Sequence, residues 1–139
     1  MARHPKKPRP LVADGRAYLW TLRHSHVDRV PEGDRSVECR QTLTLYPQPA
    51  GSGGPLRIVF ADGPGRYVPG GAPLGSGDVG YVRGGSLNLH EPGAVRALLD
   101  VALARGWQPG EQGEQGARAV EVELDGWPLL EAATGAGPP

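Results

Sequence analysis

The stretch HEPGAVRALLDVALARGWQPG, residues 90–110, predicts the one long helix of the chain. Pro92 suits the first helical position, where a backbone N–H would have no partner in any case. The apolar residues that follow repeat at the helical spacing i, i+3, i+4 and i+7: Val95, Leu98, Leu99 and Ala102. This spacing makes a single apolar stripe, so the helix needs an apolar surface to lie on.

The end of this helix predicts a structural cap. Gly106 stands where a helix commonly turns into the left-handed conformation, and Trp107 follows it. We expect the indole to fold back over the end of the apolar stripe, on Ala102 or Leu103. Pro109 prevents the helix from resuming. Gly106 and Trp107 are therefore interpreted as a helix C-cap that stabilises the fold, and not as part of a functional site.

Four other segments have the alternation or the apolar content of β-strands. They are RAYLWTLRH (16–24), RSVECRQTLTLYP (35–47), LRIVFAD (56–62) and ARAVEVELDGWPLL (117–130). The second alternates most cleanly, which is typical of an antiparallel sheet with one wet face. The third is more uniformly apolar and predicts a central strand covered on both faces. HSHVDRVPEGD, between the first two, is rich in turn formers and predicts a connector.

The order of these elements predicts an α+β fold. Gly and Pro dominate residues 63–85, so that segment is expected to be a long loop, with VGYV and the following GSLN as short strands. The expected order is β-β-β-(β)-α-β: a mainly antiparallel sheet of four to five strands, with one long helix packed on one face. Residues 1–13 are expected to be a disordered basic arm, residues 14–130 a single domain, and residues 131–139 a disordered tail.

Composition narrows the function classes. The 139 residues carry 15 Lys and Arg and 15 Asp and Glu, so the chain lacks the basic excess of a dedicated nucleic-acid binder. Its single cysteine, Cys39, excludes a disulfide within the chain and a Cys-rich zinc site, and favours a cytoplasmic location. No secretory signal is expected, because no apolar core follows the basic N-terminus. No apolar run approaches the length that crosses a bilayer, so no membrane association is expected.

The hexapeptide HSHVDR, residues 24–29, is the strongest candidate for metal chemistry. His24 and His26 lie two apart, and Asp28 adds a carboxylate ligand. These three residues resemble the His-x-His-x-Asp-His signature of metallo-β-lactamase-type hydrolases, which implies a zinc-dependent hydrolase. Arg29 stands where that family has its last histidine, and the chain is too short for that family's fold. A metal-binding protein, or a metal-dependent hydrolase with zinc as its cofactor, is therefore the alternative function. Catalysis by Cys39 is disfavoured, because it shares the apolar side of its strand.

The Gly/Pro-rich segment offers a candidate contact surface. Arg66, Tyr67, Tyr81 and Arg83 lie within it, and aromatic and arginine side chains dominate protein interfaces. The alternative is that these side chains hold a long loop against the body of the domain. A third hypothesis places nucleic acid on the basic arm, through Lys6, Lys7 and Arg9.

The segment from HEP to GWQP resembles a pattern found in small uncharacterised bacterial proteins, in which a Pro-initiated helix ends in Gly-Trp-x-Pro. The resemblance covers about 20 residues and implies a small bacterial accessory protein, with no catalytic residues. The leading prediction is therefore a non-catalytic, cytoplasmic protein that binds another protein, as an immunity or antitoxin-like subunit does. Self-association as a homodimer through exposed sheet edges is a further expectation.

Overall fold

The computed structural model describes residues 8–28, 37–49, 53–68, 77–109 and 121–135. The fold is α+β, as predicted, and contains two sheets and two helices. The main sheet contains β1 (Arg9–Ala13), β2 (Arg16–Asp28), β3 (Val37–Pro47), β4 (Leu56–Ala61) and β8 (Val122–Asp125). The second sheet contains β5 (Arg66–Tyr67), β6 (Asp78–Tyr81) and β7 (Ser86–Asn88). The helices are α1 (Pro92–Ala104) and α2 (Gly126–Thr134).

The main sheet has five strands and is mixed: three of its strand pairs are antiparallel, as predicted, and the fourth is parallel. Its order is β1-β2-β3-β4-β8, and the first four strands form an antiparallel meander. β8 pairs with β4 in parallel. The reason is the connection: the chain leaves β4, passes through the second sheet and α1, and returns by a crossover, and a crossover permits parallel pairing. Local alternation in β8 carries no information about that direction.

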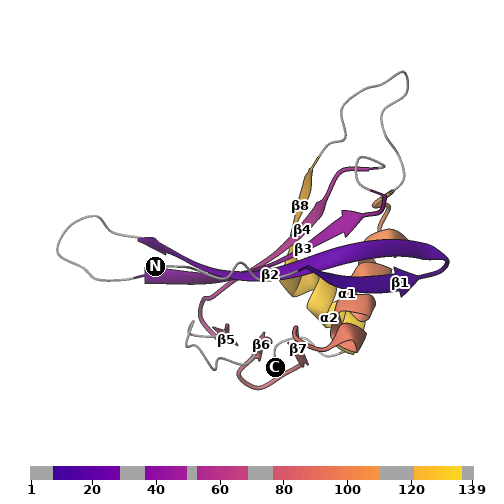
Figure 1. Ribbon diagram of the computed structural model, residues 1–139. Coiled ribbons are helices and arrows are strands. Elements are labelled where there is room, and N and C mark those ends of the chain that lie inside the picture. Colours follow the sequence, from indigo (N-terminus) through magenta and orange to yellow (C-terminus); the bar gives the residue numbers. More distant parts are fainter. Residues whose placement is uncertain (1–7, 29–36, 50–52, 69–76, 110–120, 136–139) are drawn as a thin grey trace.

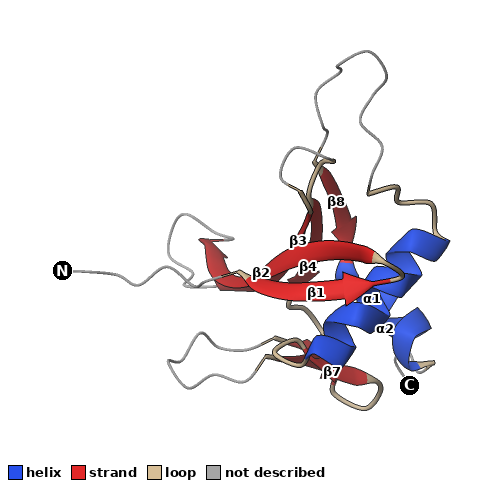
Figure 2. Ribbon diagram, turned by 45° about the vertical axis from the view of Figure 1, so that its right-hand side comes forward, coloured by secondary structure: helices blue, strands red, loops and turns tan. Residues whose placement is uncertain are grey.

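Both helices pack on the same side of the main sheet, and the second sheet lies beside them (Figure 1). A view turned by 45° gives the same layering (Figure 2). The helix predicted to lie across one face is α1, which begins at Pro92 as expected. It has 13 residues and is shorter than the long helix that was predicted. α2 is a second helix that the predicted order lacked.

The core fills the space between the main sheet and the two helices. Along each strand, alternate residues point into it: the buried ones are Tyr18, Trp20 and Leu22 on β2, Leu43 and Leu45 on β3, and Leu56, Ile58 and Phe60 on β4. The stripe of α1 is buried as predicted, and Val95, Leu98, Leu99 and Ala102 are each 0% exposed. From α2, Trp127 packs its ring edge-on to Phe60, with 5.2 Å between centroids.

The strand β4 is central in the sheet, between β3 and β8, as predicted. It is, however, fully buried on one face only. Leu56, Ile58 and Phe60 are buried, whereas Arg57, Val59 and Ala61 are partly exposed. The expectation of cover on both faces is wrong because the helices lie on one side of the sheet.

The cap at the end of α1 forms as predicted. Gly106 has a φ of 106°, and its N–H donates to the carbonyl oxygen of Leu103 at 3.1 Å. The N–H of Trp107 donates to the carbonyl oxygen of Ala102 at 3.0 Å, which completes a Schellman motif. The indole of Trp107 packs against the core, with its ring centroid 6.2 Å from that of Tyr18.

Two elements lie where disorder was expected. β1 occupies residues 9–13 of the predicted arm, and joins β2 through Asp14 and Gly15, whose φ values are 52° and 78°. Two successive left-handed residues between paired strands are the signature of a tight hairpin turn, for which Asp-Gly is a favoured sequence.

α2 extends four residues into the predicted tail. The carboxylate of Asp125 accepts a hydrogen bond from the N–H of Trp127 at 3.2 Å and caps its start. Gly135 ends it with a φ of 71°. The predicted strand at 117–130 is therefore β8 followed directly by a helix.

The predicted connector at 24–34 is also partly wrong, because β2 continues through His24 to Asp28. Residues 29–34 lie outside the described residues. In the described part of the chain, no helix is long and apolar enough to cross a membrane.

Candidate functional site: the open face of the main sheet

The side of the main sheet opposite the helices carries the best-defined candidate site; we call it the open face. No described helix or strand lies over it (Figure 1). It has a hollow of about 450 Å³. The hollow is lined by Thr21, Arg23 and Ser25 of β2, by Thr42, Thr44 and Tyr46 of β3, and by Pro55, Arg57 and Glu121.

Strand register places these side chains in rows across the sheet. Thr21 lies opposite Thr44, which in turn lies opposite Arg57, and Arg23 lies opposite Thr42. Directly opposed residues in an antiparallel pair share a face, so each row is a continuous line of polar groups. Thr42 is only 8% exposed, so its neighbours cover most of it. Hydroxyl and guanidinium groups are suited to hydrogen-bonding a ligand at fixed positions.

An apolar region adjoins the hollow where the sheet approaches the β1–β2 turn. Leu19 lies opposite both Pro10 and Tyr46, and Val12 lies opposite Ala17. Val12 is 66% and Tyr46 40% exposed, and they are two of the four large hydrophobic residues exposed among the described residues. The open face therefore combines an exposed apolar end with a polar hollow.

Charge is distributed unevenly over the open face. Arg57 Nη1 lies 3.1 Å from a carboxylate oxygen of Glu121 and 3.8 Å from one of Glu123. These two glutamates and Asp125 make the β8 side acidic. Arg23 lies on the β2 side and is exposed. Because Arg57 engages the carboxylate of Glu121, this carboxylate is poorly placed to serve as a general base in the hollow.

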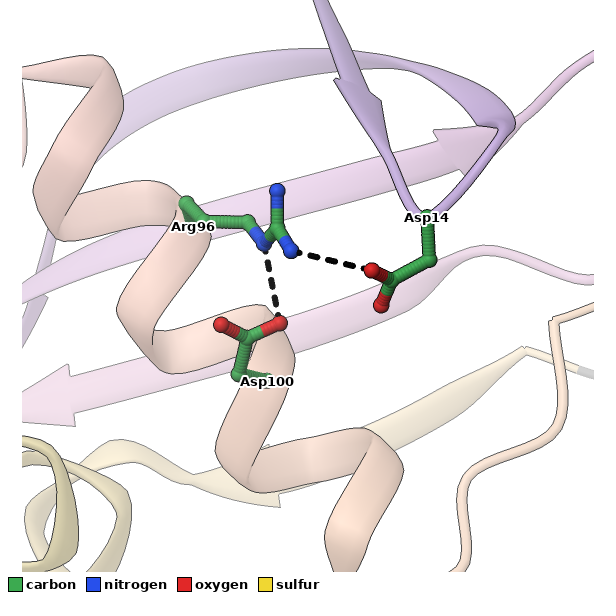
Figure 3. Close-up of polar contacts among 3 residues, drawn as sticks. All are labelled: Asp14, Arg96 and Asp100. Carbon is green, nitrogen blue, oxygen red and sulfur yellow. Dashed lines mark hydrogen bonds and ion pairs between the residues drawn. The ribbon is translucent and has the colours of Figure 1, made fainter.

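The β1–β2 turn that supports the apolar end is tied to α1 (Figure 3). Arg96 Nη2 lies 3.2 Å from Asp14 Oδ1, and Arg96 Nε lies 2.9 Å from Asp100 Oδ1. The hydrogen bond that Arg96 donates to Asp100 is the main cause that raises the pKa of Arg96. Asp100 lies one helical turn from Arg96, so the guanidinium is oriented toward the turn by its own helix.

The four residues predicted to form a contact surface are not all exposed in the structure. Tyr81 is 5% exposed, and its hydroxyl donates to a carboxylate oxygen of Glu131 at 2.6 Å. Burial, followed by this hydrogen bond, raises the pKa of Tyr81 to about 12. The guanidinium of Arg66 lies over the ring of Trp127, 5.0 Å from its centroid. Both side chains thus hold the second sheet against α2, which leaves Tyr67 and Arg83 as the exposed members of the set.

The residues predicted to bind metal lie on β2. His24, His26 and Asp28 occupy alternate positions, and the register places His24 opposite Gln41 and His26 opposite Cys39. His24 Nδ1 lies 3.1 Å from Gln41 Oε1. The side chains at positions 26 and 28 lie outside the described part of the structure. Among the described residues, no cluster of three or more His, Cys, Asp or Glu could hold a metal ion.

Cys39 is half-buried, and its backbone N–H donates to Asp62 Oδ2 at 3.2 Å. Burial, and secondarily the charge of Asp62, raises the pKa of its thiol. A raised pKa makes the nucleophilic thiolate scarce near neutral pH.

Of the residues predicted to contact nucleic acid, Lys6 and Lys7 lie outside the described residues. Arg9 belongs to β1; its guanidinium lies 4.7 Å from the ring centroid of Trp20 and donates to the carbonyl oxygen of His90 at 2.8 Å. Arg9 is thus already engaged by the fold.

The described residues form an α+β fold whose main sheet is covered by helices on one face and has a hollow on the other. In comparisons with protein families, curated proteins and solved structures, nothing matches this chain. The resemblance of its helix ending to small bacterial proteins therefore stays a prediction.

Sequence reasoning did not identify the open face as a site, although it found part of the signal. Residues 35–47 were predicted to form a strand with one wet face, and Thr42 and Thr44 lie on that face. What was missing was the register, which brings Thr21 and Arg23 of β2 beside them.

Proposed function

We propose that this chain is a non-catalytic binding protein and that its open face is the surface that contacts another protein. The observation that carries the proposal is the exposed Tyr46 at the edge of a hollow lined by hydroxyls and by Arg23, with Val12 exposed on the same face of the sheet. Interfaces typically place aromatic and apolar anchors beside a polar rim, and tyrosine and arginine are enriched among their energetic hot spots. An immunity or antitoxin-like role in the cytoplasm belongs to the same proposal.

A protein is favoured over nucleic acid as the partner. The formal net charge of the chain is zero, and on the open face Arg57 is already paired with two glutamates. Binding to a phosphate backbone depends on several unpaired cations, because affinity comes from the phosphates that they neutralise. The acidic β8 side would repel such a backbone. A protein surface of mixed charge and apolar content has no such requirement.

The test is affinity capture from an extract of the organism that encodes the chain, with matched variants. Thr44→Arg places a long side chain in the hollow, whereas Arg83→Glu alters the exposed part of the previously predicted contact surface. We expect the captured protein to be lost with Thr44→Arg and retained with Arg83→Glu, while both variants keep wild-type circular dichroism. Loss with Arg83→Glu and retention with Thr44→Arg would move the site to the second sheet and contradict the proposal.

We propose metal binding as the second candidate, because one observation favours it. The register sets His26 opposite Cys39, and alternation along β2 sets His24 on the same face as His26. A hydrogen bond from His24 Nδ1 to Gln41 Oε1 would fix the tautomer and orientation of the ring, as such hydrogen bonds do for the histidine ligands of many zinc sites. Cys39 could then replace Asp28 as a ligand, because cysteine and histidine are the usual zinc ligands.

This second candidate is tested with untagged protein and zinc. Stoichiometric zinc that is lost in both Cys39→Ser and His26→Ala, but kept in His90→Ala, would support it. His90 is the matched control, because it is an exposed histidine at the start of α1. Zinc uptake that is equal in all three variants, or absent from the wild type, would eliminate the metal site.

A further inference from the structure

We propose that the occupant of the open face is an extended acidic segment of the partner, with an apolar residue and a carboxylate four positions apart. The inference rests on the proposed function, since it names the chemistry of the protein that the open face binds. Its parts are the apolar end at Val12, Leu19 and Tyr46, the hydroxyl row of Thr21 and Thr44, and the guanidinium of Arg23.

The spacing of these parts fits an extended chain. Leu19, Thr21 and Arg23 are successive outward residues of β2, and Leu19 lies opposite Tyr46. A strand rises about 3.4 Å per residue, so Leu19 and Arg23 are separated by roughly 14 Å along the strand. A partner segment in the same extended conformation repeats its sheet-facing side chains at i, i+2 and i+4. Those three positions would meet the apolar end, the hydroxyl row and Arg23 in turn.

The charges on the open face indicate which side chain of the partner segment meets Arg23. Arg57 is held by Glu121 and Glu123, whereas no ion pair involves Arg23 among the described residues. A guanidinium presents paired donors that match a carboxylate, and charged hydrogen bonds of this kind are stronger than neutral ones. The acidic β8 side disfavours a carboxylate at the far side of the sheet. The acidic end of the segment is thus directed to the β2 side.

The apolar contact is confined to one end of the open face, which argues against a helical occupant. An amphipathic helix buries a continuous stripe of side chains at i, i+3, i+4 and i+7 in an apolar groove. Here the apolar residues give way to the Thr21–Thr44 row and then to Arg23. An extended partner segment with one apolar side chain followed by polar side chains would match this order of groups on the open face.

The probes are blocked synthetic peptides, titrated into the isotope-labelled full chain and followed by amide chemical shifts. The first has Leu, Ser and Glu at alternate positions; in the second Lys replaces Glu; in the third Glu is moved by one residue, to the opposite side of the extended peptide. We expect saturable shifts at Leu19, Thr21, Arg23 and Tyr46 with the first peptide. The second and third should bind roughly tenfold more weakly, as should the first peptide to Arg23→Gln. Arg83→Gln is the matched control and should bind the first peptide as the wild type does.

Each other outcome overturns the inference. Equal binding of the Glu and Lys peptides, shifts centred on Tyr67 and Arg83, or no saturable shift would each exclude an acidic occupant. Salt-sensitive binding of a single-stranded oligonucleotide at the same residues, tighter than that of the first peptide, would assign the open face to nucleic acid instead. If capture of the natural partner is lost with Thr44→Arg yet unchanged with Arg23→Gln, the proposed function stands and only the acidic segment is wrong.

Discussion

The two faces of the main sheet are built from the same strands but face different surroundings. On the covered face, Leu43 and Leu45 are 0% exposed beneath the helices. On the open face, their chain neighbours Thr42, Thr44 and Tyr46 line the hollow. Side chains alternate between the faces with a period of two, so one strand supplies both the core and the candidate site. Residues that stabilise the core and residues available for the proposed binding are therefore neighbours along the same strand.

The largest expected effect is a difference in stability between substitutions at two neighbouring residues that lie on opposite faces of the sheet. Leu43→Ala removes a fully buried side chain and should lower the free energy of unfolding by about 2–5 kcal/mol, through lost burial and a residual cavity. Thr44→Ala, one residue further, should change it by no more than about 0.5 kcal/mol, because Thr44 faces the hollow. Urea denaturation followed by circular dichroism measures both. Similar losses in the two variants would mean that the open face is covered and part of the core.

The sequence predicted the covered face better than the open one, for a physical reason. Burial leaves a local signal: the stripe of α1 and the inward residues of β2 and β3 can be read from spacing within a single element. The Schellman cap at Gly106 is equally local, because one glycine and the residues around it define it. A binding face assembled from several strands has no such local signal, since its residues are brought together by register.

The elements that the sequence analysis missed show where prediction from local sequence fails. The Asp14–Gly15 turn was available as a hairpin signal, but the basic and proline-rich composition before it suggested disorder. The residues of α2 form a short apolar run that follows a strand directly, and periodicity alone cannot distinguish a buried strand from a buried helix in such a run. The parallel direction of β8 depends on the path of the chain through α1. The burial of Tyr81 depends on its contact with Glu131, 50 residues away in sequence.

The second prediction tests how tightly the covered face is packed. A Cβ atom at Gly126 would lie 2.6 Å from ring carbons of Phe60, which is 0% exposed. Gly126→Ala should therefore destabilise the fold by about 1–3 kcal/mol through overpacking, although alanine is the better helix former. Gly93→Ala in α1 is the matched control, because nothing lies within 4 Å of its added Cβ, and it should be neutral or stabilising. Thermal unfolding of the two variants compares them. A stable Gly126→Ala protein would show that the ring of Phe60 can move aside.

The third prediction concerns the buried tyrosine that joins the second sheet to α2. The pKa of Tyr81 is raised from 10.0 to about 12, first by burial and then by the hydrogen bond to Glu131. Its neutral form is thus favoured in the folded state, and this stability is fully present below pH 10 and lost as the pH rises toward 12. Between those values the wild type should lose stability faster than Tyr81→Phe, which has no proton to release. Urea denaturation across this pH range measures the difference. Parallel losses in the two proteins would mean that Tyr81 titrates normally.

The smallest expected effect is at the contact that supports the apolar end of the open face. Arg96 is paired with Asp14 and Asp100 across exposed surface, and pairs of this kind contribute little to stability and weaken as salt rises. Arg96→Gln should therefore reduce stability slightly at low salt and leave it unchanged at high salt. Asp100→Asn is the matched control, because it removes the charge of the partner within α1 and leaves the ion pair of Arg96 with Asp14 in place. If Arg96→Gln also weakens partner capture while Asp100→Asn does not, the link between α1 and the β1–β2 turn positions Val12 for binding. An unchanged capture in Arg96→Gln would show that the hairpin turn holds the apolar end in place without help from the helix.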